Sequence, residues 1–288
     1  MSLELEFAVE AVAAACRLTS AVQDARGEVA AAVKNDRSPV TVADYGAQAV
    51  VCRLISERFG ADRVIAEEGA AELLDSGAPG LRRALLAVVR ENFDSQASLR
   101  SVSAWLEHGR RGDSPRCWVL DPVDGTKGFL RGEQYAVALG LLEDGELRLG
   151  VLGCPRMTPR RGDGPGCLFA AARGQGAFES PLADTSARET IRVSGPKPAA
   201  ELVLVESVES GHADHGAQSR VRQLLGAEAD ALRLDSQAKY GAVARGEADV
   251  YLRLPNPKTP DYREKIWDHA AGALIVAEAG GRVTDVAG

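Results

Sequence analysis

The spacing of apolar residues along this chain of 288 residues predicts helices first and strands later. Up to residue 107 the apolar side chains recur mainly at helical spacing. Beyond it the pattern becomes strand-like, in "CWVLD", "YAVALGLLEDGELRLGVLGCP" and "CLFAAARGQGAF". The helices expected in the first part are residues 3–23, 43–59, 81–92 and 97–107, with a short apolar step at 64–66 and a loop over 69–80.

Turn signals separate the strand-like part from the last third of the chain. The Glu-Asp-Gly-Glu sequence at 143–146 lies between apolar runs and predicts a hairpin. The stretch 155–166, "PRMTPRRGDGPG", is the most loop-like and predicts a boundary between a domain of residues 1–155 and one of residues 156–288. From about residue 200 strand-like and helical segments alternate, so we expect an α+β half followed by a layered α/β half. The later helices are expected near 215–226, across 236–245 and at 269–279.

Composition and charge limit the classes of partner. The chain is 45% hydrophobic and 26% charged, as is typical of a globular protein in water. Its net charge of −7 disfavours a nucleic-acid polymer, because the overall electrostatic term is repulsive. A small anion can still bind in a locally positive pocket. The sequence has no run of 18 apolar residues, which argues against a membrane partner.

The N-terminus and the cysteines bear on the compartment. Residues 1–23 carry acids near their start and predict an amphipathic helix rather than a signal or transit peptide. The five cysteines are scattered, odd in number and without a Cys-x-x-Cys pair, which suits a reduced protein. We therefore expect a cytoplasmic protein, with an organelle left open if a transit peptide precedes this sequence. The residues leave the oligomeric state open, and a monomer is the expectation.

Two acids, Asp121 and Asp124, lie three positions apart at the end of an apolar run, in "VLDPVDGTKGFLRG" at 119–132. Like charges so close repel each other, and each carboxylate favours protonation or solvation over a shared site. Either the segment is a solvated turn, or a cation lies between the two acids. Pro122 fixes its own φ angle and helps to hold both side chains in one orientation.

Further acids lie at the ends of other expected elements. Asp44 lies where a strand-like step meets a helix, and Asp268 precedes the last expected helix. Glu67 and Glu68 follow "VIA". Each has an ordinary explanation, since aspartates suit helix N-caps, the glutamates suit a solvated loop, and Asp-Pro-Val-Asp-Gly suits a turn. Taken together the acids favour one site, because α/β proteins assemble sites where their elements end.

Such a site suits phosphate chemistry with a divalent cation. Ligand sets of oxygen alone are typical of hard cations such as Mg²⁺, which would relieve the repulsion between Asp121 and Asp124. Gly125 and Thr126 begin an expected helix whose free N–H groups form an anion site. The combination indicates metal-assisted phosphate hydrolysis. "DGTKGF" lacks the Gly-x-x-x-x-Gly-Lys-Ser/Thr spacing, which disfavours a nucleoside triphosphate site of that kind.

Long motifs of the sequence resemble one family of phosphatases. "AEEGA", "DPVDGTKGF" and "WDHAAGALIVAEAGG" are similar to the signature motifs of the lithium-sensitive, magnesium-dependent phosphomonoesterases typified by inositol monophosphatase. "ESVESGH", "LDSQAKY", "YLRLP" and "YREKIWDHAAG" resemble the 3′(2′),5′-bisphosphate nucleotidase branch rather than the inositol branch. The resemblance covers nearly the whole chain and implies a layered α-β-α-β-α sandwich.

The resemblance implies a role for each matching position. Asp44 and Thr126 would hold and polarise the attacking water. The N–H groups of Gly125 and Thr126 would bind the phosphate being cleaved. No ligand role matches Glu68, which we expect to be a solvated neighbour. The site would bind two or three Mg²⁺ ions. Their ligands would be Glu67, Asp121, the Val123 carbonyl, Asp124 and Asp268.

Contacts to a nucleotide are implied as well. The matching positions are His212, Ser236, Lys239 and Arg253. From the residues alone, Lys239 and Arg253 are better explained as surface charges, and His212 as a loop histidine. His212 and His215 are three positions apart, but they do not form the His-Glu-x-x-His motif of a zinc site.

The implied activity is hydrolysis of the 3′-phosphate of adenosine 3′,5′-bisphosphate (PAP) to AMP and phosphate. A second substrate would be its 5′-phosphosulfate analogue, 3′-phosphoadenosine 5′-phosphosulfate (PAPS). Two alternatives stay open: an inositol (poly)phosphate 1-phosphatase and, from another class, a sensor that binds a nucleotide without turnover. The sensor alternative rests on the last residues, "GGRVTDVAG", after which relatives continue with a strand and a closing helix. We therefore expect the C-terminal layer of the sandwich to be incomplete.

Overall fold

A mixed sheet of seven strands lies at the centre of the computed structural model, which describes residues 2–25, 31–33, 39–75, 79–110, 112–208, 215–254, 263–285 and 287–288. The strand order is β3-β4-β5-β6-β7-β8-β9, so strands that pair also follow one another along the chain. β3 and β4 are parallel and the other pairs are antiparallel. The bounds are β3 (Arg63–Ala66), β4 (Arg116–Asp124), β5 (Ala136–Glu143), β6 (Glu146–Cys154), β7 (Cys167–Ala172), β8 (Ala177–Pro181) and β9 (Glu189–Ile191).

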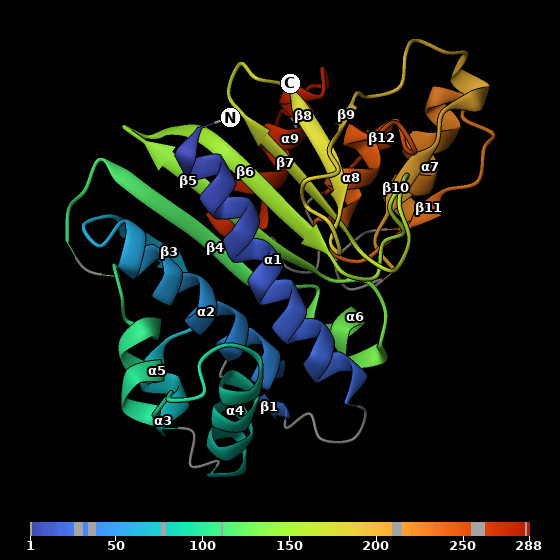
Figure 1. Cartoon of the computed structure of the whole chain (residues 1–288). Coiled ribbons are helices and arrows are strands. Elements are labelled where there is room, and N and C mark those ends of the chain that lie inside the picture. The colour runs from blue at the N-terminus through green and yellow to red at the C-terminus, as the bar shows by residue number, and fades with distance from the viewer. Residues whose placement is uncertain are drawn as a thin grey trace.

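Helices cover both faces of this sheet. α1 (Leu3–Asp24) and α2 (Val42–Arg58) pack on one face, where Leu139 and Val151 join their apolar cluster. α8 (Ala238–Ala244) and α9 (Ala270–Glu278) belong to the cluster on the other face, with the neighbouring strand residues Ala138 and Leu152. Successive side chains of a strand point to opposite faces, so both sides of the sheet are buried. Figure 1 shows the blue α1 in front of the green strands and the red α9 behind them.

The helix α9 lies unusually close to the sheet because glycine lines the contact. A Cβ added to Gly150 on β6 would lie 2.5 Å from the carbonyl oxygen of Ala271. A Cβ on Gly140 of β5 would lie 3.4 Å from the Cβ of Ala270. One on Gly272 would lie 2.3 Å from the ring of Tyr240, so α9 also lies close to α8. This packing brings the short turn before α9, η2 (Ile266–Asp268), against β4 and β5. The sheet thereby fixes the position of Asp268.

A second, parallel sheet lies beyond α8. Its order is β11-β10-β12, with bounds β10 (Leu204–Glu206), β11 (Leu232–Arg233) and β12 (Val250–Tyr251). α7 (His215–Leu225) is the outer helix on this side (Figure 1). The layers are therefore helices α1 and α2, the large sheet, helices α8 and α9, the small sheet, and α7. This is the expected α-β-α-β-α order.

The helices α3 (Ala70–Asp75), α4 (Pro79–Asn92) and α5 (Leu99–Leu106) form a separate group beside α2 (Figure 1). The loop predicted over 69–80 is wrong for residues 70–75, which form α3. Leu73 is fully buried among residues of α2, α4 and α5. That tertiary contact stabilises a helix of six residues, a length too short for periodicity to reveal. The remaining elements are β1 (Ala31–Val33) and β2 (Pro39–Thr41), which pair with each other, α6 (Thr126–Arg131) and η1 (Ala199–Glu201).

Two predictions concern the connections of the large sheet. The hairpin between β5 and β6 is confirmed, and Asp144 and Gly145 in its turn have positive φ angles of 52° and 80°. β6 and β7 pair directly across the predicted boundary at 155–166, so one sheet contains strands from both predicted domains. The division at residue 155 stays a prediction.

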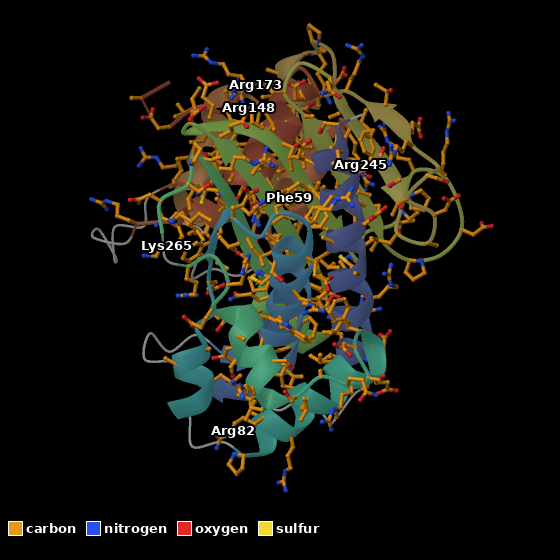
Figure 2. The ribbon with its side chains drawn as sticks, turned by 60° about the vertical axis from the view of Figure 1, so that its left-hand side comes forward. Phe59, Arg82, Arg148, Arg173, Arg245 and Lys265 are labelled. Atoms are coloured by element: carbon orange, nitrogen blue, oxygen red, sulfur yellow. The ribbon has the colours of Figure 1, made fainter. Side chains whose placement is uncertain are left out.

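The aromatic contacts near the end of α2 tie the N-terminal helices to the sheet. Phe59, labelled in Figure 2, follows α2 and lies 5.5 Å from Trp118 of β4 between ring centroids. The Trp118 indole donates to Asp62 at 2.9 Å. All five cysteines are free thiols, and burial raises the pKa of Cys52 to about 12. None of the described helices has the length and apolarity needed to cross a membrane.

Candidate active site

The end of β4 carries the two acids of the Asp-Pro-Val-Asp motif. Asp121 pairs with Ala138 of β5 and Asp124 with Ala136, so three steps on β4 match two on β5. Pro122, which has no N–H to donate, lies in this irregularity. A regular strand would point residues 121 and 124 to opposite faces. The irregularity instead lets both carboxylates reach the same place.

That place is an acidic cluster with a third member from the far end of the chain. Carboxylate oxygens of Asp121, Asp124 and Asp268 all lie within 4.8 Å of one another. Asp121 is only 3% exposed, and its Oδ1 has no hydrogen-bond partner among the described residues. The Asp268 Oδ2 accepts a hydrogen bond from the Lys265 N–H at 2.7 Å. Asp268 is the third residue of η2 and the N-cap of α9 is His269, so the explanation of Asp268 as the N-cap of the last helix is wrong.

The carboxylates of Glu67 and Asp44 also lie close enough to Asp121 to raise its pKa. Burial raises the pKa of Asp121 well above its usual range, and the charges of Asp124, Glu67, Asp268 and Asp44 raise it further, in that order. Asp44 is the third residue of α2, so it is not the N-cap, and it is 2% exposed. Glu67 comes directly after β3. The fold thus brings together every acid that the sequence singled out as a ligand or water-holding residue.

Glu68 differs from its prediction. It was expected to be a solvated neighbour, but its side chain is completely buried. Its backbone makes two hydrogen bonds with the side chain of Gln48 on α2, at 2.8 Å and 2.6 Å. The prediction failed because a pair of adjacent glutamates gives no sign of which one turns inward.

The composition of the cluster fits a hard divalent cation. Every donor is an oxygen, several carboxylates share one buried place, and an oxygen of Asp121 lacks a partner among the described residues. Ionised carboxylates so close and so buried are unfavourable without a compensating positive charge. The residues present therefore have the chemistry of a metal site.

The turn after Asp124 lies beside a loop from the second half of the chain. Gly125 is the N-cap of α6 with a φ angle of 86°, and a Cβ there would lie 3.0 Å from the Cβ of Ser236. Glycine is needed both for the left-handed backbone and for this close approach. The Thr126 hydroxyl donates to the Val123 carbonyl at 3.2 Å, while Val123 itself is 1% exposed.

Ser236 and Lys239 come from the segment that leads into α8. Ser236 has a positive φ angle of 66°, a strained backbone for a residue other than glycine. Lys239 is 2% exposed, so the surface-charge explanation is wrong for this residue. Its Nζ donates to the Leu234 carbonyl at 3.2 Å. Burial lowers the pKa of Lys239 to about 8, against the opposing charge of Asp124.

Arg253 is the second cation beside Asp124. Burial raises the pKa of Asp124 above its usual value, while the charges of Lys239 and Arg253 lower it. Arg253 forms an ion pair with Glu264, which also contacts His269. His269 Nδ1 in turn lies 2.8 Å from the Tyr240 hydroxyl. The predicted contacts Ser236, Lys239 and Arg253 therefore lie together at one edge of the acidic cluster.

His212 lies outside the described residues. Sequence reasoning missed Gln48, Glu264 and Gln237, whose backbone N–H donates to Asp124. Gln48 lies one helical turn after Asp44, and that spacing is the only sequence signal that could have suggested it.

Known sequences match this chain over nearly its whole length. The sequence profile described as the inositol monophosphatase family matches residues 3–288. A 3′(2′),5′-bisphosphate nucleotidase of Emericella nidulans is 44% identical over 319 residues, covering 100% of this chain and 89% of the relative. The 3′(2′),5′-bisphosphate nucleotidase 1 of Arabidopsis thaliana is 41% identical over 300 residues, covering 96% of this chain and 84% of the relative.

Solved structures agree on the fold. The extragenic suppressor protein suhB of Bartonella henselae superposes with a TM-score of 0.69 at 23% identity, covering 99% of this chain and 88% of that chain. CysQ of Bacteroides thetaiotaomicron, a bacterial member of the inositol monophosphatase family, gives a TM-score of 0.63 at 20% identity, with 96% and 86% covered. At these identities the likeness establishes the architecture alone.

Proposed function

The chain belongs to the inositol monophosphatase family, and we propose that it is a magnesium-dependent phosphatase that removes the 3′-phosphate of PAP. The observation that carries the proposal is the buried acidic cluster around Asp121, with the cations Lys239 and Arg253 beside it at Asp124. The names of the similar nucleotidases support the same substrate. A bisphosphate substrate needs both the acidic cluster and the cations, because one phosphate reacts and the other must be bound.

The metal site is proposed to use the acids that the fold brings together. When bound, two or three Mg²⁺ ions would offset the negative charge of the phosphate and lower the pKa of the attacking water. The proposed ligands are the carboxylates of Glu67, Asp121, Asp124 and Asp268 and the Val123 carbonyl.

The attacking water is proposed to lie between Asp44 and Thr126. The Thr126 hydroxyl donates a hydrogen bond to the Val123 carbonyl, so the lone pairs of the hydroxyl oxygen can accept a hydrogen bond from water. Asp44 is buried and close enough to affect Asp121, so its carboxylate would take up the proton that the water loses. The N–H groups of Gly125 and Thr126, at the start of α6, would bind oxygens of the reacting phosphate.

The remaining phosphate of the substrate is proposed to bind Lys239 and Arg253. Both side chains are cationic and lie next to Asp124, so they offer a second anion position beside the reacting one. Ser236, against Gly125, would contact the nucleotide between the two positions, and His212 is expected to contact the adenosine part. PAPS, with a phosphosulfate in place of the 5′-phosphate, is proposed as a second substrate.

The two predicted domains are proposed to supply different parts of the site. Residues 1–155 would form the domain that supplies most metal ligands, and residues 156–288 the domain that supplies the nucleotide contacts and Asp268. The substrate is a small molecule, and the five free thiols support a location in the reducing cytoplasm. A monomer is proposed as its oligomeric state.

A direct test compares two substrates under the same conditions. The purified chain is given PAP and inositol 1-phosphate separately with Mg²⁺, and released phosphate is measured. We expect PAP to have the much higher kcat/KM. A clear preference for inositol 1-phosphate would assign the chain to the inositol phosphate branch. Tight PAP binding by calorimetry with no phosphate release at any Mg²⁺ concentration would make it a sensor.

A further inference from the structure

We propose that Gln48 is a positioning residue that holds Glu67 in the acidic cluster by binding the backbone of the next residue, Glu68. The inference rests on the proposed metal site and adds a residue to it that binds neither metal nor substrate.

The need for such a residue arises where the chain leaves the sheet. β3 is the first strand in the order of the sheet and pairs only with β4 among the described strands. Its last pair is Ala66 with Leu120. Glu67 follows immediately, beyond the last strand partner. The sheet therefore does not fix the backbone that carries the Glu67 carboxylate.

Gln48 replaces the missing strand partner. Its Nε2 donates to the Glu68 carbonyl at 2.6 Å, and its Oε1 accepts from the Glu68 N–H at 2.8 Å. The side chain is completely buried. A carboxamide can supply one donor and one acceptor side by side, as a paired strand does, whereas a carboxylate or a thioether cannot. Arg110 adds a third bond, from its Nη1 to the same carbonyl at 2.5 Å.

The position of Gln48 on α2 links two parts of the site. Asp44 lies four residues earlier, on the same face of the helix. α2 therefore places the proposed water-binding carboxylate directly and, through Gln48, the proposed metal ligand Glu67. If Gln48 loses its two bonds, Glu67 can move relative to Asp44 and Asp121, and the cluster binds a cation less tightly. Residues that orient metal ligands typically change metal affinity by about 10–100-fold when they are replaced.

The test measures Mg²⁺ binding without any substrate. Mg²⁺ is titrated calorimetrically into the metal-free wild type and the Gln48→Met variant, which keeps the side-chain volume but loses both bonds. We expect the affinity to fall by about 10–100-fold. Phosphate release from PAP should need correspondingly more Mg²⁺, while kcat at saturating Mg²⁺ recovers to within a few-fold of wild type.

A matched control removes a similar pair of bonds elsewhere. Glu278 accepts from the N–H groups of Gly174 and Gly176, at 2.8 Å and 2.9 Å, in the turn between β7 and β8. Glu278→Leu should leave the Mg²⁺ affinity unchanged. Unchanged affinity in Gln48→Met, or an equal loss in Glu278→Leu, would overturn the inference.

A second variant covers the case in which Gln48→Met does not fold. Arg110 is about one-third exposed, so Arg110→Met is less disruptive, and it should weaken Mg²⁺ binding in the same direction but by less. Unchanged affinity there would count against the inference. A wild type that binds Mg²⁺ but leaves PAP intact would reject the proposed function alone. A wild type that hydrolyses PAP with no change in Gln48→Met would reject the role of Gln48 alone.

Discussion

The backbone N–H of Gln237 donates to the Oδ2 of Asp124 at 2.5 Å. The Gln237 side chain also donates to the carbonyl of Trp267 at 2.9 Å, in the turn that carries Asp268. One residue at the start of α8 thus touches both β4 and η2, which supply acids to the cluster. The site is therefore held together by the contact between the first and second halves of the chain.

The first prediction concerns the acids of β4. Asp121→Asn or Asp124→Asn removes one of the charges that would hold the metal, so kcat for PAP should fall by about 10²–10³ or more. Phosphate release is measured at saturating Mg²⁺. The exposed Asp163→Asn serves as the control and should keep wild-type activity. Near-normal turnover in either cluster variant would exclude the proposed metal site.

The second prediction concerns stability against pH without metal. Burial and the neighbouring acids raise the pKa of Asp121, so the folded state holds a proton that the unfolded state releases at lower pH. Stability must then fall as the pH rises from the unfolded pKa towards the folded one. Asp121→Asn removes this contribution. Thermal unfolding in a chelator should show a smaller loss of stability between pH 5 and pH 8 in Asp121→Asn than in wild type.

The same experiment has a check with metal present. Mg²⁺ binds the folded state, so saturating Mg²⁺ should raise the Tm of the wild type at pH 8 and have less effect on Asp121→Asn. If the two proteins lost stability in parallel with rising pH, Asp121 would not be the source of the pH dependence.

Much of the fold and of the metal site could be predicted from the sequence because the signals are local. The period of α1 and the Asp-Gly turn of the β5–β6 hairpin each depend on a short stretch of chain. The acids of the cluster could be named because each ends or begins an element. The features that could not be predicted depend on contacts between distant segments. Glu68 turns inward because Gln48 binds its backbone, and no local pattern specifies that partner.

The residues proposed to bind the nucleotide also could not be predicted from local sequence patterns. Lys239 in "LDSQAKY" is indistinguishable from a surface lysine until the packing of α8 against the neighbouring layers is known, and the structure leaves it 2% exposed. Only the resemblance to a family singled it out. The ion pair of Arg253 with Glu264 likewise joins two residues that no local sequence pattern pairs.

The third prediction separates stability from activity. Glu179 on β8 and Arg245 after α8 form an ion pair at 3.1 Å, with both side chains at most 5% exposed (Arg245 is labelled in Figure 2). Glu179→Ala removes one of two carboxylates that pair with the buried Arg245 guanidinium, since Glu247 remains, and should destabilise the protein by about 1.5–3 kcal/mol. Denaturant unfolding measures this change.

Its control is an exposed pair of the same charges. Arg53 and Glu57 lie one turn apart on α2 at the surface, and Glu57→Ala should cost about 0.5 kcal/mol or less. The Glu179→Ala protein that remains folded should keep the wild-type KM for PAP. A loss of stability no larger than that of Glu57→Ala would mean that the buried pair makes no special contribution.

The last prediction separates the two phosphate positions. Lys239 is proposed to hold the phosphate that is not cleaved, an interaction equally present in the ground and transition states, so its loss should change KM more than kcat. A hydrogen bond to a charged group is worth about 1.5–3 kcal/mol, which corresponds to a KM about 10–100-fold higher in Lys239→Met. Thr126→Ala should instead lower kcat, because its hydroxyl is proposed to position the attacking water.

The control for Lys239 is a substrate without the second phosphate. Adenosine 3′-phosphate has nothing for the Lys239 Nζ to bind, so Lys239→Met and wild type should act on it with similar KM values. The buried Nζ also donates to the Leu234 carbonyl and faces the charge of Asp124, so its removal could disturb the fold or the acidic cluster as well. Either disturbance would reduce activity on both substrates equally. Equal losses would therefore assign Lys239 a structural role, and a loss confined to PAP would assign it the second phosphate.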